Sequence, residues 1–193
     1  MGLDDTPSNF APGSPEIRAL AARIDRPVVL VGMMGVGKST IGRRLAAMLE
    51  CTFVDADDEI VAAAGMPIKD IFEEFGEPYF RDGERRVIQR LMESGPGVIA
   101  TGGGAFTTDE TRRIILSNGI AVWLDSDTDT LVERVGRNDK RPLLNGGDTR
   151  AIVERMRRER EPAYAQAPIK VMSDRGPHNA AVMRILEALD EWL

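Results

Sequence analysis

The sequence that sets the fold is Gly32-Met33-Met34-Gly35-Val36-Gly37-Lys38-Ser39-Thr40, which matches the pattern G-x-x-x-x-G-K-[ST]. A continuous apolar run, Val28–Val31, precedes it, and a helical pattern, Thr40–Leu49, follows it. Glycines let backbone N–H groups surround a phosphate because no Cβ stands in the way. The start of the following helix adds a favourable dipole and N–H groups that lack helical partners. We therefore predict a strand, a phosphate-binding loop and a helix, in that order.

Four more short apolar runs occur along the chain, each bounded by turn or helix signals. Because they are apolar without alternation, they are typical of strands buried on both faces of a parallel sheet. Helical patterns lie between them, and this alternation predicts an α/β domain with right-handed crossovers. The predicted strands are Val28–Val31, Thr52–Val54, Val98–Ala100, Ala121–Leu124 and Ile169–Met172; the predicted helices include Thr40–Leu49, Gly83–Glu93, Asp109–Leu116, Asp129–Val135, Thr149–Arg160 and about Asn179 to Trp192.

The chain has 193 residues, which suits one domain with room for a small inserted lobe. Apolar residues make up 42% of it, enough for a sizeable core, and no apolar run approaches the ~18 residues that a membrane span needs. The acidic N-terminus has no apolar segment, so we expect no secretory signal. The single cysteine, Cys51, excludes an internal disulfide and fits a reducing compartment, so we expect a cytoplasmic protein.

Charge is unevenly distributed. The whole chain carries 25 Lys and Arg against 31 Asp and Glu, a net charge of −6, but between Arg134 and Arg160 nine basic residues stand against four acidic ones. A basic region in an acidic protein favours a small polyanionic ligand over a long nucleic acid. A solvated helix face gives the same charge pattern. We expect neither a nucleic acid nor a membrane as partner.

The end of the loop pattern supplies a cation and a metal ligand. Lys38 offers a mobile positive charge to the β- and γ-phosphates of a nucleotide, and the Ser39 hydroxyl can ligate Mg²⁺. A GTPase would carry Asn-Lys-x-Asp to read guanine, but no asparagine in this chain is followed by lysine. We therefore expect a nucleoside triphosphate with Mg²⁺, and a GTPase is disfavoured.

Two carboxylates end the second predicted strand. Alternate residues of an extended chain share a face, so Asp55 and Asp57 can point together at the carboxyl edge of the sheet, where α/β proteins bind ligands. One could hold a water bound to Mg²⁺ and the other a substrate hydroxyl. The alternative is that Asp57 or Asp58 only caps the next helix.

Further along the chain, glycines and an arginine suggest a site for a second ligand. Gly102-Gly103-Gly104 follows the third predicted strand and allows close backbone approach to an anion or polar group. Arg81 begins a long amphipathic helix and could form a two-pronged contact with a substrate carboxylate. Taken singly, the glycines could form a simple turn and Arg81 could be a surface residue.

Together these segments resemble shikimate kinase, a member of the nucleoside-monophosphate-kinase-like branch of P-loop enzymes. The resemblance covers about residues 27 to 193. The segments, in family order, are the loop at 32–40, F-x-D-x-D at Phe53 to Asp57, Phe80-Arg81, the glycines at 102–104, R-P-L-L at Arg141 to Leu144, and R-x-P-x-Y at Arg160 to Tyr164.

The resemblance implies a P-loop NTPase-type, three-layer α/β/α fold with a five-stranded parallel sheet of order 2-3-1-4-5, a lid and a small acceptor-binding lobe. It implies transfer of the γ-phosphoryl group of ATP to the 3-hydroxyl of shikimate, giving shikimate 3-phosphate and ADP. That reaction is a step of chorismate and aromatic amino acid biosynthesis. The implied cofactors are ATP and Mg²⁺, and we expect a monomer.

The resemblance also assigns roles to matching positions. Arg81 and Arg160 would clamp the shikimate carboxylate, and Asp57 and the glycine backbone would fix its hydroxyls. Ser39 would ligate Mg²⁺ with help from Asp55. The implied catalytic residues are Lys38, Asp57 and Arg141; the nucleotide-binding residues are Gly35, Val36, Gly37, Lys38, Ser39, Thr40, Arg134, Arg141, Arg175 and Pro177; the substrate-binding residues are Asp57, Arg81, Gly102, Gly103, Gly104 and Arg160.

We divide the chain into an N-terminal extension, 1–26, with a loose tail and a short helix, and one domain, 27–193. Within the domain the acceptor lobe spans about 57–92 and the lid about 136–148. The lid segment is basic and turn-rich with glycines near its ends, so it can open and close at low cost. Closure would bring Arg141 onto the transferring phosphate.

Three rival interpretations stay open at this point. The first is another small-molecule kinase of the same fold, acting on gluconate or a nucleotide. The second is a nucleotide-dependent regulatory protein without turnover. The third pairs Cys51 with His178 as catalytic groups, which we disfavour because a lone His and a lone Cys are more often structural.

Overall fold

The computed structural model describes residues 10–136, 148–173 and 176–193. Five parallel strands form one sheet in the order β2-β3-β1-β4-β5. In the register, Val28 of β1 lies opposite Val98 of β3 and Ile120 of β4. The fold class and strand order implied by the resemblance are therefore confirmed. The strands are β1 (Val28–Val31), β2 (Phe53–Asp55), β3 (Val98–Ala100), β4 (Ile120–Asp125) and β5 (Ile169–Met172).

The strands differ in burial according to their place in the sheet. Every residue of β1, β3 and β4 is buried, as the continuous apolar runs predicted. The two edge strands depart from that expectation: β2 is only half-buried, and β5 alternates between buried and exposed residues. An edge strand has a neighbour on one side only and is less fully covered by helices.

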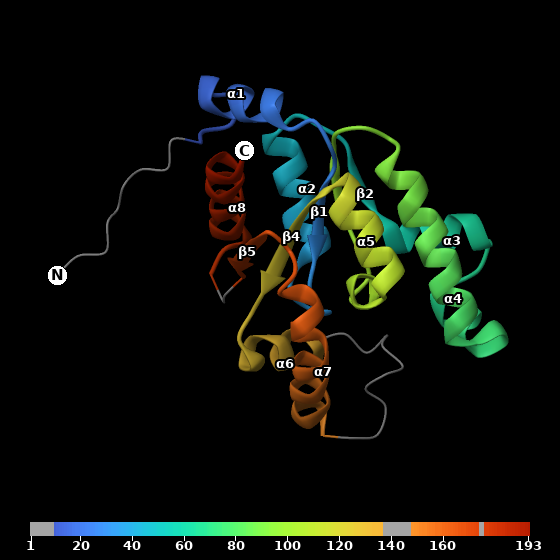
Figure 1. Cartoon of the computed structure of the whole chain (residues 1–193). Coiled ribbons are helices and arrows are strands. Elements are labelled where there is room, and N and C mark those ends of the chain that lie inside the picture. The colour runs from blue at the N-terminus through green and yellow to red at the C-terminus, as the bar shows by residue number, and fades with distance from the viewer. Residues whose placement is uncertain (1–9, 137–147, 174–175) are drawn as a thin grey trace.

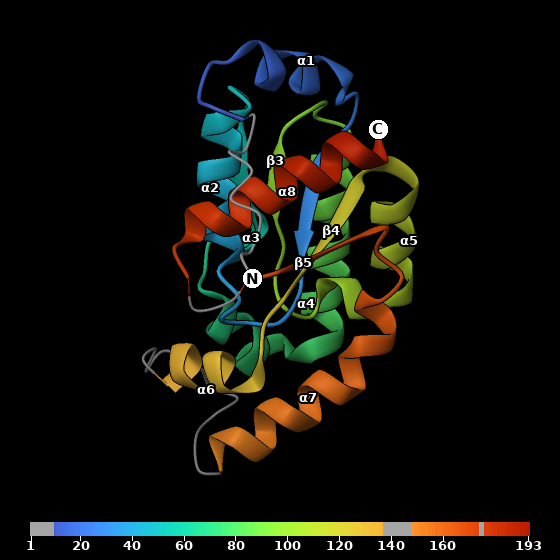
Figure 2. The same ribbon diagram turned by 90° about the vertical axis from the view of Figure 1, so that its left-hand side faces the viewer.

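Helices cover both faces of the sheet (Figures 1 and 2). On one face, α2 (Lys38–Met48) packs against α8 (His178–Trp192), and on the other α4 (Ile68–Met92) packs against α5 (Asp109–Asn118). A shorter helix, α3 (Ala56–Ala64), packs on α4, and a 3-10 turn, η1 (Ala105–Thr107), follows β3. At the carboxyl end of the strands lie α6 (Thr128–Gly136) and α7 (Thr149–Tyr164), as Figure 1 shows.

Helix α4 begins well before the helix predicted over Gly83–Glu93. It consists of two pieces joined at Gly76, whose backbone has φ 80° and ψ 173°. Only glycine adopts this conformation readily. Gly76 and Pro78 interrupt the helical pattern in the sequence, and for this reason its first half was not predicted.

The short helix expected in the N-terminal extension is α1 (Pro15–Arg23). Its cap is Ser14, whose hydroxyl accepts a hydrogen bond from the Ile17 backbone N–H at 3.3 Å. Ile17 and Leu20 are buried, and Arg23 pairs with Asp190 of α8. Figure 1 shows α1 at the end of the molecule opposite α6 and α7, so this helix closes the end of the core away from the strands' carboxyl ends.

The predicted lid falls almost wholly outside the described residues, because residues 137–147 are among those not described. The described part of the chain resumes at Asp148, whose carboxylate caps α7 by accepting from the Arg150 backbone N–H at 3.0 Å. No helix among the described residues is long and apolar enough to cross a bilayer.

Candidate active site

The phosphate-binding loop joins β1 to α2 as the sequence predicted. Gly37 precedes the helix in the left-handed conformation, at φ 95°, which explains why glycine stands there. Lys38 is buried at the first helical position, and its ammonium donates to the Gly32 carbonyl at 2.8 Å and to the Met33 carbonyl at 2.9 Å. The Lys38 side chain therefore lies across the phosphate-binding loop, held by two of its carbonyls.

Two contacts, one from the residue after β5 and one from α6, set the direction of one loop peptide. The Val36 carbonyl accepts from the Ser173 hydroxyl at 2.9 Å and from the Arg134 guanidinium at 3.3 Å. The C=O and N–H of a trans peptide point in opposite directions. Holding this carbonyl therefore also fixes the Gly37 N–H, which points the opposite way.

Ser39 and Asp55 meet at the start of α2. The Ser39 hydroxyl donates to the Asp55 carboxylate at 2.5 Å, and the other oxygen of Asp55 accepts from the Asp57 backbone N–H at 3.1 Å. Asp55, and not Asp57 or Asp58, is therefore the cap of α3. A hydroxyl and a carboxylate are the hard oxygen donors that Mg²⁺ prefers. Among the described residues, no group of three or more His, Cys, Asp or Glu is arranged to hold a metal ion, so an ion here would also need water or phosphate ligands.

Two carboxylates converge on Gly102. A Cβ built there would lie 2.8 Å from the Asp57 Oδ1 and 3.1 Å from the Glu84 Oε1, so only glycine leaves room for both. Glu84 is 1% exposed, and its Oε1 has no hydrogen-bond partner among the described residues. Burial raises the pKa of the Glu84 carboxyl; Arg81 offsets part of this rise and the nearby charge of Asp57 adds to it.

The Arg81 side chain extends from α4 toward the triple glycine and contacts two acidic residues. Its NH1 donates to Glu84 at 2.6 Å, and its Nε and NH2 donate to Glu77 at 3.2 and 3.3 Å. A Cβ on Gly104 would lie 2.3 Å from the Arg81 NH2, so the glycine backbone lies directly against this guanidinium. The arginine is therefore pre-oriented beside the loop.

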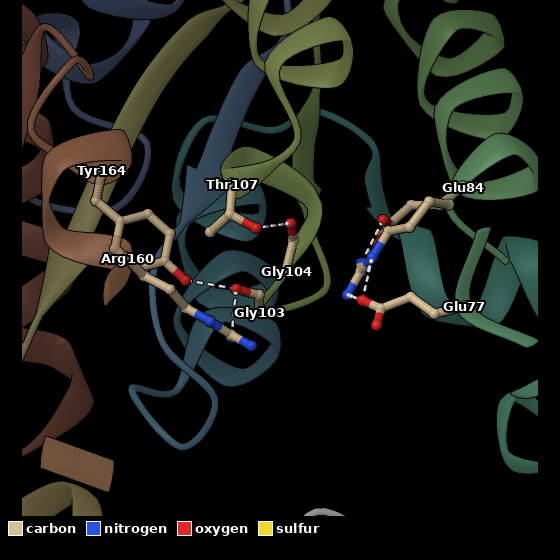
Figure 3. A network of polar contacts seen from close by, with 8 residues as sticks. Glu77, Glu84, Gly103, Gly104, Thr107, Arg160 and Tyr164 are labelled. Atoms are coloured by element: carbon tan, nitrogen blue, oxygen red, sulfur yellow. Dashed lines mark hydrogen bonds and ion pairs between the residues drawn. The ribbon is translucent and has the colours of Figure 1, made fainter. Parts of the chain in front are cut away.

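The second predicted arginine reaches the same loop from α7. The Arg160 NH1 donates to the Gly103 carbonyl at 3.0 Å, and the Tyr164 hydroxyl donates to the same oxygen. A Cβ on Gly103 would lie 3.1 Å from the Met34 backbone nitrogen in the phosphate-binding loop. Figure 3 shows Gly103 and Gly104 lying between Arg160 and the pair Glu77 and Glu84. One glycine segment thus touches the phosphate-binding loop and both arginines.

Comparisons with known proteins identify relatives of this chain. The model of the family described as shikimate kinase matches residues 34–190. A shikimate kinase from Novosphingobium aromaticivorans is 60% identical over 184 residues, 93% of this chain and 95% of that protein. The chain belongs to the shikimate kinase family.

Two further comparisons extend this result. A shikimate kinase from Bradyrhizobium diazoefficiens is 53% identical over 176 residues, covering 91% of this chain and 85% of the relative. Among solved structures, the shikimate kinase from Acinetobacter baumannii in complex with shikimate has a TM-score of 0.82 at 34% identity. That match covers 86% of this chain and 93% of the other. The family resemblance read from six sequence segments is therefore confirmed.

Some residues implied by the family resemblance lie outside the cluster. Arg141 and Arg175 belong to segments outside the described residues. Pro177 stands at the cap position of α8, next to His178, whose ring lies 3.5 Å from a Cβ built on Gly37. Burial, followed by the charges of Arg134 and Arg44, lowers the pKa of His178.

The pairing of Cys51 with His178 is wrong. Cys51 precedes β2 and lines a small apolar cavity with Val28 and Gly97, at the amino ends of the strands. His178 lies against Gly37, at the carboxyl ends of the strands. The two side chains therefore lie at opposite ends of the parallel strands.

Sequence reasoning missed three residues that hold the site together. Glu84 carried a usable signal, because a residue three positions after Arg81 on a helix lies beside it. Tyr164 was noted only as the last letter of the R-x-P-x-Y segment. Ser173 carried no signal, since it meets Val36 across 137 residues of sequence.

Proposed function

We propose that this chain is an ATP-dependent shikimate kinase, which transfers the γ-phosphoryl group of ATP to the 3-hydroxyl of shikimate and releases shikimate 3-phosphate and ADP. This would be a step of aromatic amino acid biosynthesis. The observation that carries the proposal is the glycine segment 102–104, which lies against the phosphate-binding loop and both Arg81 and Arg160. Such an arrangement supports a small carboxylate-bearing acceptor beside the triphosphate.

Each acceptor contact has a candidate residue. Arg81 and Arg160 approach the glycine segment from opposite sides, which suits a guanidinium pair around one carboxylate. Asp57, directed at the same segment, would orient the attacking hydroxyl and accept its proton. Fixing the acceptor in this way contributes to rate chiefly by positioning, because phosphoryl transfer has a loose transition state.

The phosphate side relies on the loop and its lysine. The Lys38 ammonium would shift from the carbonyls of Gly32 and Met33 to the β- and γ-phosphates. The Gly37 N–H would donate to a phosphate oxygen bound in the loop. Ser39, assisted by Asp55, would hold Mg²⁺, which neutralises phosphate charge when bound. Arg134 as an adenine contact and Arg141 as a lid residue rest on the family resemblance.

The domain organisation supports the same function. Helices α3 and α4 form the proposed acceptor lobe, 57–92, and the proposed lid, 136–148, connects α6 to α7. The proposed substrate-binding residues then come from the acceptor lobe, from the loop after β3 and from α7, all within one chain. A monomer and a cytoplasmic location stay predictions.

A coupled assay of ADP release tests the function. Purified protein with ATP and Mg²⁺ should release ADP in proportion to added shikimate, and the Lys38→Met variant should not. Gluconate and nucleoside monophosphates are tried in parallel. ADP release with one of these and none with shikimate would overturn the acceptor, and nucleotide binding without ADP release for any acceptor would favour a regulatory protein.

A further inference from the structure

Tyr164 is a buried tyrosine whose ring and hydroxyl make separate contacts. It ends α7, one helical turn after Arg160, and is 1% exposed. Its ring stacks against Phe106 of η1 and Trp123 of β4, with centroids 6.5 and 5.9 Å away. A phenylalanine would make these ring contacts equally well, so packing explains the ring but not the hydroxyl.

The hydroxyl acts on the same oxygen as Arg160. A carbonyl oxygen has two lone pairs, and the Gly103 carbonyl accepts from both the Tyr164 hydroxyl and the Arg160 NH1 (Figure 3). Burial raises the pKa of Tyr164, so the phenol stays protonated at neutral pH and keeps its proton to donate. The Arg160 contact with Gly103 uses one of five guanidinium N–H groups, and the Arg160 guanidinium also interacts with the Tyr164 hydroxyl.

A triple glycine needs such outside contacts. Residues 102–104 have no Cβ to limit their dihedral angles, so the direction of their peptides is set by what they touch. Fixing the Gly103 carbonyl fixes the peptide that joins it to Gly104 and turns the Gly104 N–H the opposite way. The other side of this segment lies against Arg81. The carbonyl is therefore the point at which the spacing of the two arginines is set.

We propose that Tyr164 is a positioning residue for the acceptor: its hydroxyl fixes the Gly103 carbonyl and thereby the separation of Arg160 from Arg81. This inference rests on the proposed function, since it assigns the pair of arginines to the acceptor carboxylate. If the tyrosine were purely structural, loss of its hydroxyl would lower stability and leave the affinity for both substrates unchanged. If it positions the acceptor, loss of the hydroxyl changes the KM for shikimate and leaves the KM for ATP as it was.

The test compares two tyrosine-to-phenylalanine variants, because the chain has only two tyrosines. Tyr164→Phe keeps the ring and removes the hydroxyl, whereas Tyr79→Phe removes a hydroxyl from a side chain that is 53% exposed. For Tyr164→Phe we expect the KM for shikimate to rise about three- to tenfold, the range of one hydrogen bond, with the KM for ATP unchanged. Tyr79→Phe should match the parent protein in both constants.

The remaining outcomes separate the two proposals. If the parent protein phosphorylates shikimate and Tyr164→Phe shows a lower Tm with an unchanged KM for shikimate, the positioning role is wrong and the function stands. If the parent protein releases no ADP with shikimate, the function itself fails. Combining Tyr164→Phe with Arg160→Lys should raise KM by less than the product of the single effects, because both residues act on one carbonyl.

A second measurement leaves Tyr164 in place, in case its variant does not fold. The Tyr79→Phe protein, grown with 3-fluorotyrosine, has a single fluorine resonance, which comes from position 164. We expect shikimate to shift this resonance and ADP to leave it unmoved. A resonance that ignores saturating shikimate in an active enzyme contradicts the proposal.

Discussion

Gly102 shows how one missing side chain permits a site. Asp57 and Glu84 approach each other across it, and the like charge of Asp57 adds to the raised pKa of Glu84. A carboxylate pair of this kind needs either a cation or a proton nearby, and Arg81 supplies the cation.

The Gly102→Ala variant should lose activity without losing its fold. The added methyl would lie 2.8 Å from the Asp57 carboxylate and force it aside, so we expect kcat/KM to fall about tenfold to a hundredfold. Gly83→Ala is the matched control, because a Cβ there has nothing within 4 Å. Steady-state rates of both variants decide the matter, and equal rates would show that Asp57 does not need this space.

Glu84→Gln should change how stability depends on pH. The pKa of Glu84 is raised on folding, so the folded state binds more protons than the unfolded state above about pH 4.3. The contribution of Glu84 to the free energy of unfolding therefore falls as the pH rises from this value through the pKa of Glu84 in the folded state. The variant lacks this fall, so urea unfolding at successive pH values above about 4.3 should show its stability rising relative to the parent. Parallel curves would indicate that Glu84 titrates normally.

At the scale of elements, α7 is attached to the sheet on successive turns. Arg160 and Tyr164 bind the glycine loop, and Arg157 binds the buried Asp125 at the end of β4 with two contacts of 3.2 Å. Lys170 of β5 binds the same carboxylate at 3.0 Å. The helix that carries Arg160 is thus fixed independently of any ligand.

Removing this attachment should cost stability. Arg157→Met leaves the Asp125 carboxylate with Lys170 and the Ser126 backbone N–H, and we expect a loss of about 1–3 kcal/mol, toward the lower end because Arg157 is part-exposed. Arg155→Met on the same helix, whose pair with Glu159 is exposed, should change stability by less than about 0.5 kcal/mol. Denaturant midpoints compare the two, and similar losses would rule out a special place for Arg157.

The elements were predictable where one periodicity dominated. The central strands follow directly from continuous apolar runs, whereas α4 was divided in the sequence pattern by Gly76 and Pro78. Helix α7 extends past Pro162 to Tyr164, although the prediction ended at Arg160. A proline removes one hydrogen bond only, and near the end of a helix the carbonyl it leaves can be hydrated.

Part of the geometry of the proposed site was predictable for the same kind of reason. Glycines, paired carboxylates and arginines at family spacing predicted residues that the structure brings together, and their roles toward the ligands stay predictions. Glu84 and Ser173 escaped because they act on other protein groups, and such contacts arise only when distant segments fold together. Sequence alone therefore suggests candidates for the groups that face a ligand, but not the protein groups that hold those candidates in place.

On the scale of the whole molecule, α1 is part of the core although it lies in the N-terminal extension. Leu20→Ala should destabilise the protein by about 2–5 kcal/mol, because the side chain is fully buried, and kcat should stay as it was, since the helix lies at the far end from the site. Ala19→Ser, exposed on the same helix, is the control. Thermal unfolding with parallel activity assays tests this, and an unchanged Tm would mean that α1 is dispensable.

The acidic partners of Arg81 have a consequence for the thermodynamics of acceptor capture. Glu77 and Glu84 accept from three of the five N–H groups of this guanidinium, so in the proposed site an incoming carboxylate would compete with two existing anions and would not meet a bare charge. The net gain of such an exchange is small compared with a newly made ion pair. Selection among acids would then arise from shape and geometry, and weak net attraction would favour rapid turnover of the pocket's occupant.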